Sequence, residues 1–188
     1  MALLSARAVG QRAARVRLLA LDVDGVLTDG RLYFGPRGEA MKAFDVRDGL
    51  GIRLLQQAQI EVAIITGRSS PIVAVRAREL GISSVLQGQA DKAAALRGLL
   101  ADRGLAPREC AYMGDDWPDL PALAIAGLAA TVADATVEVR RRVHWMAPSP
   151  GGRGAVRDLA RLLLGAQGRL APLLAAARGA KVPEFARG

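Results

Sequence analysis

Short apolar runs alternate with longer segments in which apolar residues recur at helical spacing. Runs of strand length occupy residues 18–23, 61–65, 84–86, 110–113, 128–132 and 143–146. Helical spacing is found at about 48–58, 69–80, 91–103, 118–125, 136–142 and 154–165. This alternation predicts an α/β fold, in which a central parallel sheet is covered by helices on both faces through right-handed crossovers.

Residues 31–44 depart from this alternation. Two short apolar segments flank Gly35-Pro36-Arg37-Gly38, which is a turn signal between strands. We therefore expect a β-hairpin, placed within ten residues of the acidic pair described below. Such a hairpin could overhang a site as a flap or contact another subunit, and an ordinary surface hairpin is the alternative.

The two ends of the chain differ from the central part, residues 16–167, which we expect to form one domain. Residues 1–15 are rich in arginine and contain no acidic residue, which would also suit a transit peptide. We expect an N-terminal extension with a frayed end and a short helix. Residues 168–188 show no sustained periodicity, so a flexible, loosely held or disordered tail is expected there.

The composition is that of a globular protein, because 51% of the 188 residues are hydrophobic and 23% are charged. A single cysteine, Cys110, excludes an internal disulfide and favours a reducing compartment. No apolar run reaches the length of about 18 residues that a spanning helix needs. We therefore expect a cytoplasmic protein with no membrane partner.

The net charge of +8 raises the alternative of a nucleic-acid-binding protein. However, the arginines are spread along the chain at helical spacing, as on solvated faces. Aromatic residues make up only 4%, which leaves little surface for base stacking. A basic surface can also attract a small phosphorylated anion. We therefore expect a small-molecule substrate and no nucleic-acid partner.

Polar residues follow the strand-like runs at the places where a parallel sheet binds its ligands, beyond the carboxyl ends of the strands. The first run ends in an acidic pair, the second in a hydroxyl and a guanidinium, and the fourth in three carboxylates, while an ammonium begins segment 91–103. In chain order these residues are Asp22, Asp24, Thr66, Arg68, Lys92, Asp115, Asp116 and Asp119. Singly, each has a structural explanation such as a helix cap or a solvated charge. Together they predict one site at one edge of the sheet.

These residue types suit phosphoryl transfer through a covalent aspartyl phosphate. Asp22 could attack phosphorus, with Mg²⁺ held by Asp22, Asp115 and the Asp24 backbone carbonyl to offset the repulsion between anions. Thr66 and Lys92 could hold the remaining phosphate oxygens in the transition state. Asp24 could protonate the leaving alkoxide and later take a proton from the attacking water.

With these motifs in place, the chain resembles the haloacid dehalogenase superfamily of aspartate-nucleophile phosphatases. The four matching segments are LDVDGVLTDG, IITGR, QGQADK and MGDDWPD. The stretches KAFDVRDGLGIRLL and GGRGAVRDLARLLL extend the resemblance to a small branch without a cap domain, over most of residues 16–167. The resemblance implies a Rossmann-like, three-layer α/β/α fold with a hairpin flap and no cap domain.

The resemblance also implies a role for each matched residue. Asp22 would be the nucleophile and Asp24 the acid/base, with Asp22, Asp24 and Asp115 as Mg²⁺ ligands. Asp116 and Asp119 would orient the metal shell and Lys92. Substrate would be bound by Arg47, Asp48, Gly49, Thr66, Gly67, Arg68 and Arg153.

The resemblance further implies a cytoplasmic homotetramer whose hairpins pack together over sites that have no cap, with segment 151–154 reaching a neighbouring subunit's site. The implied reaction releases 3-deoxy-D-manno-octulosonate from its 8-phosphate, a step in making the lipopolysaccharide inner core. A phosphatase of a nine-carbon sialic-type acid, or one of broader sugar specificity, is the alternative, but such nine-carbon enzymes carry an acidic residue where this chain has Arg68. A phosphomutase would need a cap that is not visible. A noncatalytic nucleic-acid-binding or regulatory protein on the same fold is a remote alternative.

The chain departs from the family pattern at three positions near these motifs. Asp45 replaces the usual asparagine before VRDG, which would add a negative charge near an anionic substrate. Trp117 and Pro118 replace smaller aliphatic residues after GDD, where proline is acceptable in the first turn of a helix.

The single histidine, His144, is expected to be packed and not catalytic.

Overall fold

One six-stranded sheet organises the protein in the computed structural model, which describes residues 3–179. All its strand pairs are parallel, and the strand order is β5-β4-β1-β6-β7-β8. The strands are β1 (Leu18–Leu21), β4 (Glu61–Ile65), β5 (Ser84–Leu86), β6 (Cys110–Met113), β7 (Leu128–Thr131) and β8 (Trp145–Met146). Each coincides with one of the expected apolar runs, although three strands are shorter than predicted. The prediction of a parallel α/β fold is confirmed.

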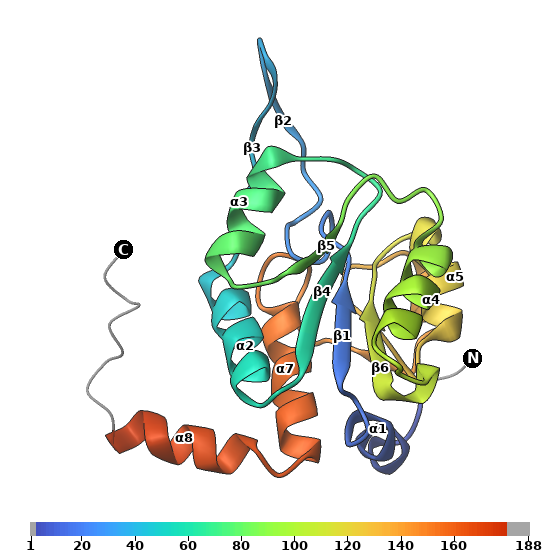
Figure 1. Cartoon of the computed structure of the whole chain (residues 1–188), viewed down its shortest axis with the longest axis vertical. Helices are drawn as coiled ribbons and strands as arrows, with labels where there is room; N and C mark the ends of the chain where they lie inside the picture. The colour runs from blue at the N-terminus through green and yellow to red at the C-terminus, as the bar shows by residue number, and fades with distance from the viewer. Residues whose placement is uncertain (1–2, 180–188) are drawn as a thin grey trace.

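Helices cover both faces of this sheet (Figure 1). Helices α2 (Val46–Gln57), α3 (Pro71–Glu79) and α7 (Ala155–Ala166) lie on one side, and α4 (Lys92–Asp102) and α5 (Leu120–Ile125) on the other. The remaining short elements are α1 (Ala6–Ala13), α6 (Val137–Arg140) and the 3₁₀ turns at Pro107–Glu109 and Trp117–Asp119. Every residue of β1, β6 and β7 is buried, as expected for strands covered on both faces.

The chain leaves β1 toward β4 and β5 and then returns to β6 on the other side of β1. The strand order therefore reverses between β1 and β6, and a crevice at the carboxyl ends of these two strands is the expected ligand site of such a sheet. Polar caps start the helices close to this edge. The Ser70 hydroxyl accepts from the backbone of Val73, and the Asp91 carboxylate accepts from that of Ala94.

The expected hairpin is present as strands β2 (Tyr33–Gly35) and β3 (Gly38–Met41), which pair antiparallel. It projects beyond the carboxyl-end edge of the sheet (Figure 1). The apolar side chains of Phe34 and Met41 are 65% and 53% exposed on it. Among the described residues, no domain is inserted beside the hairpin, so the site edge has no cap.

The C-terminal part differs from the expectation. Residues Leu170–Gly179 form helix α8, so of the expected flexible, loosely held or disordered tail the disordered alternative is wrong there. Leu170 and Leu173 pack against the core, and the Gln167 amide donates to the carbonyl oxygens of Ala13 and Val16. The leucines at 170, 173 and 174 have the spacing of one helix face, a signal too short to stand out in an alanine-rich segment. Residues 180–188 of the expected tail lie outside the described residues.

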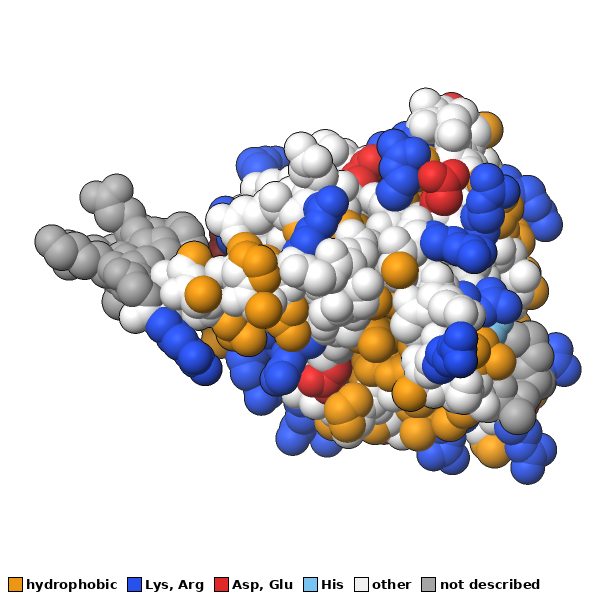
Figure 2. Space-filling view, turned by 90° about the horizontal axis from the view of Figure 1, so that it is seen from below, with side chains coloured by type: hydrophobic (Ala, Val, Ile, Leu, Met, Phe, Trp, Pro, Cys, Tyr) orange, Lys and Arg blue, Asp and Glu red, His pale blue; other side chains and the backbone are white. Residues whose placement is uncertain are grey.

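The N-terminal extension contains the expected short helix, α1, whose Val9 and Ala13 are buried. Residues 1 and 2, where a frayed end was expected, lie outside the described residues. Basic side chains form several separate groups on the face opposite the crevice (Figure 2). None of the helices within residues 3–179 is both long enough and apolar enough to cross a lipid bilayer.

A buried carboxylate joins α2 to the start of α7. Asp48 accepts hydrogen bonds from the backbone N–H groups of Gly154, at 3.2 Å, and Arg157, at 2.8 Å. Burial raises the pKa of Asp48 to about 6, although these two donors oppose the rise. At Gly51 an added Cβ would lie 3.1 Å from the Arg157 Cα, so a side chain there would push the two helices apart by a few tenths of an ångström.

Replacing Asp48 with alanine is expected to destabilise the protein by about 1–3 kcal/mol, because one buried and one half-buried backbone donor lose their acceptor. Urea unfolding monitored by circular dichroism measures this change. Asp102→Ala, at the exposed end of α4, serves as the control and should change stability by less than about 0.5 kcal/mol. Equal stability of the two variants would contradict the structural role given to Asp48.

Candidate active site

A pocket of about 360 Å³ lies at the carboxyl-end edge of the sheet. Asp22 directly follows β1, and its backbone N–H donates to the Met113 carbonyl of β6 at 3.0 Å. The Thr66 N–H donates to the Leu86 carbonyl in the same way at 2.9 Å. The sequence-predicted residues that line the pocket are Asp22, Asp24, Thr66, Gly67, Arg68, Lys92, Asp115, Asp116 and Asp119.

Lys92 is the cation at the base of this pocket. Its side chain is 5% exposed, and its Nζ lies 3.0 Å from Asp22 Oδ2 and 2.7 Å from Asp119 Oδ1. Burial opposes the charged form of Lys92, but the two carboxylates outweigh it and raise the pKa of this lysine. Lys92 therefore remains an ammonium ion that holds two carboxylates side by side.

Asp119 supports the site and is not itself open to a ligand, because it is buried and both of its carboxylate oxygens accept hydrogen bonds. Its Oδ1 also accepts from the Tyr112 hydroxyl at 2.7 Å, and its Oδ2 accepts from the backbone N–H groups of Asp115 and Asp116. This arrangement fixes the loop that carries Asp115. Tyr112 was not predicted from the sequence, because a tyrosine inside the apolar stretch CAYM has the signature of a core residue.

Three carboxylates of the pocket crowd together. Ligand oxygens of Asp22, Asp115 and Asp119 all lie within 4.8 Å of one another. Burial, and then the charges of Asp119 and Asp22, raise the pKa of Asp115 to about 8. Burial and the charge of Asp119 also raise the pKa of Asp22, to about 6, although Lys92 opposes this. When all three carboxylates are ionised, they and the Lys92 ammonium carry two net negative charges.

The unpartnered oxygens of this cluster fit a hard divalent cation. Oδ1 of Asp22 and Oδ1 of Asp115 are buried, and within residues 3–179 neither has a hydrogen-bond partner. Buried polar atoms are normally paired, and carboxylate oxygens are the ligands that Mg²⁺ prefers. The donor set and its excess negative charge therefore match a divalent cation held between Asp22 and Asp115.

Asp24 has different partners from Asp22. Its Oδ1 accepts from the Lys42 ammonium, and its Oδ2 lies 3.6 Å from Arg68 Nε. Glu39 contacts the same two cations. Sequence reasoning missed Lys42 and Glu39, because charged residues on a hairpin give no signal that they turn inward.

Two glycine segments meet beside the acidic pair. Gly25 has φ +90°, and a Cβ there would overlap the Asp115 carboxylate. A Cβ at Gly151 would overlap the carbonyl oxygen of Gly25, and the Gly152 N–H donates to the Val26 carbonyl at 2.9 Å. The glycines of GGRG therefore allow the backbone of this chain to support its own acidic loop.

Four predicted substrate residues, Arg47, Asp48, Gly49 and Arg153, do not line the pocket. Arg47 is exposed and pairs with Asp45, and it donates to the carbonyl of Arg153. Asp45 caps α2 by accepting from the Arg47 backbone N–H. Its negative charge is also paired with the Arg47 guanidinium. The pKa of Asp45 is lowered mainly by its hydrogen bonds from Arg47.

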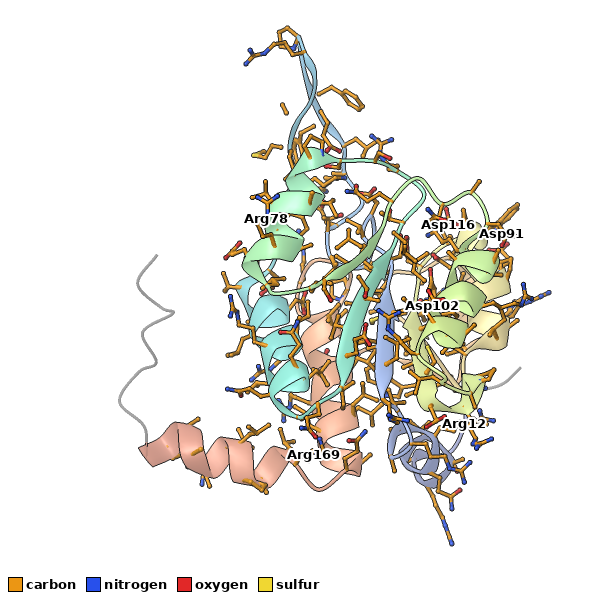
Figure 3. The ribbon with its side chains drawn as sticks, in the orientation of Figure 1. Arg12, Arg78, Asp91, Asp102, Asp116 and Arg169 are labelled. Atoms are coloured by element: carbon orange, nitrogen blue, oxygen red, sulfur yellow. The ribbon has the colours of Figure 1, made fainter. Side chains whose placement is uncertain are left out.

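The remaining singled-out residues lie as follows. Trp117 is 61% exposed beside the pocket, and Pro118 lines it. His144 is buried, and its Nδ1 accepts from the Ala129 N–H, as expected for a packed residue. Asp116 and Asp91 lie toward the pocket end of the molecule, whereas Arg12 and Arg169 lie at the opposite end (Figure 3).

Comparison with known proteins agrees with this geometry. Residues 39–127 match the haloacid dehalogenase-like hydrolase family. The 3-deoxy-D-manno-octulosonate 8-phosphate phosphatase KdsC of Yersinia pestis is 49% identical over 160 residues, which are 85% of this chain and 86% of that protein.

Solved structures are similar over the same span. The Y. pestis phosphatase aligns with a TM-score of 0.86 over 87% of this chain and 89% of its own. The phosphatase of Moraxella catarrhalis, in complex with magnesium ion, phosphate ion and KDO, aligns with a TM-score of 0.88 at 44% identity, over 90% of this chain and 97% of its own. These similarities confirm the resemblance drawn from the motifs. The chain belongs to the 3-deoxy-D-manno-octulosonate 8-phosphate phosphatases of the haloacid dehalogenase-like hydrolase family.

Proposed function

We propose that this protein hydrolyses 3-deoxy-D-manno-octulosonate 8-phosphate to 3-deoxy-D-manno-octulosonate and phosphate. The observation that carries the proposal is the Asp22 carboxylate, held by Lys92 beside Asp115 with one buried oxygen unpartnered, at the open edge of the sheet. The names of its relatives and the KDO and phosphate bound to the M. catarrhalis enzyme support the substrate. The product would serve lipopolysaccharide inner-core synthesis.

The chain's own residues account for two displacements. In the first, an Asp22 oxygen bonds to phosphorus, the bond from phosphorus to the C8 oxygen breaks, and Asp24 gives its proton to that oxygen. In the second, Asp24 takes a proton from water as the water oxygen attacks the aspartyl phosphate, which restores Asp22 and releases phosphate. The ammonium of Lys92 and the hydroxyl of Thr66 would hold the other phosphate oxygens.

Asp22, Asp115 and the backbone carbonyl of Asp24 would hold Mg²⁺, with Asp116 and Asp119 orienting the ligands. When bound, the cation supplies positive charge that offsets the repulsion between the Asp22 carboxylate and the phosphate. The magnesium in the M. catarrhalis enzyme and the cobalt in the phosphatase of Haemophilus influenzae support a divalent metal here.

Substrate choice would depend on groups around the pocket rim. Arg68 is 44% exposed and could pair with the sugar-acid carboxylate, with Gly67 leaving room beside it. We place four residues at the end of the substrate away from the phosphate: Arg47, Asp48, Gly49 and Arg153. Asp48 would act indirectly, by holding the loop before α7. A nine-carbon sialic-type acid is the second candidate substrate, and the basic Arg68 favours the eight-carbon acid.

We further propose a cytoplasmic homotetramer in which the hairpins pack together. The exposed apolar side chains of Leu32, Phe34 and Met41 support this packing, because such side chains on a projecting hairpin gain from burial. Segment 151–154, with the exposed Arg153, could then reach the neighbouring site. Sedimentation velocity of the purified chain measures the assembly.

A phosphate-release screen tests the reaction. Purified protein is offered sugar-acid, sugar and nucleotide phosphates, with Mg²⁺ or with EDTA. We expect the octulosonate ester to give the highest kcat/KM, and EDTA to abolish release. Preference for a nine-carbon ester would establish the second candidate. Binding of nucleic acid at physiological salt without any phosphate release would favour the noncatalytic alternative.

Replacing Asp22 with asparagine should lower kcat by about a thousandfold or more, because the amide cannot act as the nucleophile. Asp24→Asn should still form phosphoenzyme slowly from esters with good leaving groups, and acid quenching with a labelled ester detects it. Thermal melting checks that both variants fold. Near-normal turnover by Asp22→Asn would refute the covalent mechanism.

Gly25→Ala should weaken Mg²⁺ binding by about tenfold or more, because the added methyl group displaces the Asp115 carboxylate. Isothermal titration calorimetry measures this affinity. Gly10→Ala is the matched control, since a Cβ at that helical position meets nothing within 4 Å. Unchanged Mg²⁺ affinity in Gly25→Ala would mean that Asp115 is not a ligand.

A further inference from the structure

The hairpin sends two charged residues back into the edge of the site. Lys42 directly follows β3, and only 1% of its side chain is exposed. Glu39 lies on β3, with 13% of its side chain exposed. Long charged side chains are seldom buried unless they are paired. The burial of Lys42 and Glu39 is therefore explained by the charged groups with which they pair.

These partners form one connected cluster. The Lys42 ammonium contacts Asp24 Oδ1 and lies 3.0 Å from Glu39 Oε1. Arg68 approaches the same two carboxylates less closely, at 3.6 Å from Asp24 Oδ2 and 3.8 Å from Glu39 Oε1. The Ser70 hydroxyl donates to Glu39 Oε2. Two cations thus face two carboxylates, and the cluster is neutral as a set.

Lys42 is the rigid partner of Asp24 in this cluster. Its side chain is buried and makes the closer contact, whereas the Arg68 side chain is 44% exposed and lies farther away. A buried, hydrogen-bonded partner limits the rotation of a carboxylate far more than an exposed one, because the exposed side chain moves with solvent. Lys42 therefore sets the direction in which the Asp24 carboxylate points.

We infer that Lys42 is a positioning residue that holds Asp24 in the orientation needed to protonate the leaving oxygen, with Glu39 and Ser70 fixing Lys42 in turn. The inference rests on the proposed function, in which Asp24 is the acid/base. Glu39 also keeps Lys42 paired when Asp24 engages the substrate. The hairpin thereby supplies a working part of the site, in addition to covering it.

The leaving group of the substrate provides the test. An aryl phosphate with a good leaving group needs little help from an acid, whereas one with a poor leaving group needs a well-placed proton donor. The value of kcat/KM reports only the steps up to departure of the alcohol. It therefore measures proton donation to the leaving group separately from the later hydrolysis of the aspartyl phosphate. It is measured for 4-nitrophenyl phosphate and phenyl phosphate with the Mg²⁺-loaded enzyme.

Lys42→Met keeps the length of the side chain and removes its charge. We expect kcat/KM to fall about tenfold more for phenyl phosphate than for 4-nitrophenyl phosphate, relative to the wild type. Arg97→Met, at an exposed position of α4, removes one positive charge from a residue that does not line the pocket and should leave the ratio unchanged. An equal loss for both esters in Lys42→Met would mean a merely structural role and would overturn the inference.

A second variant covers the case in which Lys42→Met does not fold, and the wild type is measured in parallel. If Lys42→Met does not fold, Lys42→Arg gives the same comparison, because the guanidinium keeps the charge but places its donors differently. An unchanged ratio in the variant that folds again overturns the inference. Phosphate release by the wild type is measured in parallel. An inactive wild type would refute the proposed function, whereas an active wild type with an unchanged variant would refute only the role of Lys42.

Discussion

Everything at this site depends on how the protein tolerates buried carboxylates at one edge of one sheet. Oxygens of Asp22, Asp115 and Asp119 lie within 4.8 Å of one another, and burial together with the charges of Asp119 and Asp22 raises the pKa of Asp115 to about 8. Lys92 relieves part of this repulsion by holding Asp22 and Asp119. When all three carboxylates are ionised, two net negative charges remain, with one unpartnered oxygen on each of Asp22 and Asp115. Asp22 and Asp115 could hold a divalent cation, whose charge would complete the balance beside the proposed nucleophile.

The backbone of the fold brings these carboxylates and Lys92 together. Parallel strands place the ends of β1, β4 and β6 side by side, so residues far apart in the sequence meet at one edge. Glycines then let loops approach more closely than side chains would allow, as where Gly151 packs on Gly25. A second cluster, which is neutral, surrounds Asp24 and includes Lys42 from the hairpin. The two aspartates of the opening motif therefore have different electrostatic surroundings, which suits an attacking group and a proton carrier.

Much of this could be predicted from the sequence, because strand positions follow from apolar runs and strand ends in a parallel sheet converge. The pocket accordingly contains Asp22, Thr66, Lys92 and Asp115. The contributions of Lys42 and Tyr112 could not be predicted, since each depends on a side-chain direction that no local pattern encodes. The hydrogen bonds from the start of α7 to Asp48, which the resemblance placed among the substrate residues, likewise could not be predicted. Helix α8 was missed because its apolar face spans barely more than one turn.

The most direct test of this account is thermal unfolding across pH, with Mg²⁺ and with EDTA. Without metal, the folded chain keeps protons on Asp22 and Asp115 that the unfolded chain has lost, because both pKa values are raised. Their contribution to stability therefore falls as pH rises from about 4 to about 8. Bound Mg²⁺ replaces these protons. The account predicts that the increase in Tm caused by Mg²⁺ grows between about pH 5 and about pH 8. An increase that is absent, or the same at every pH, would contradict it.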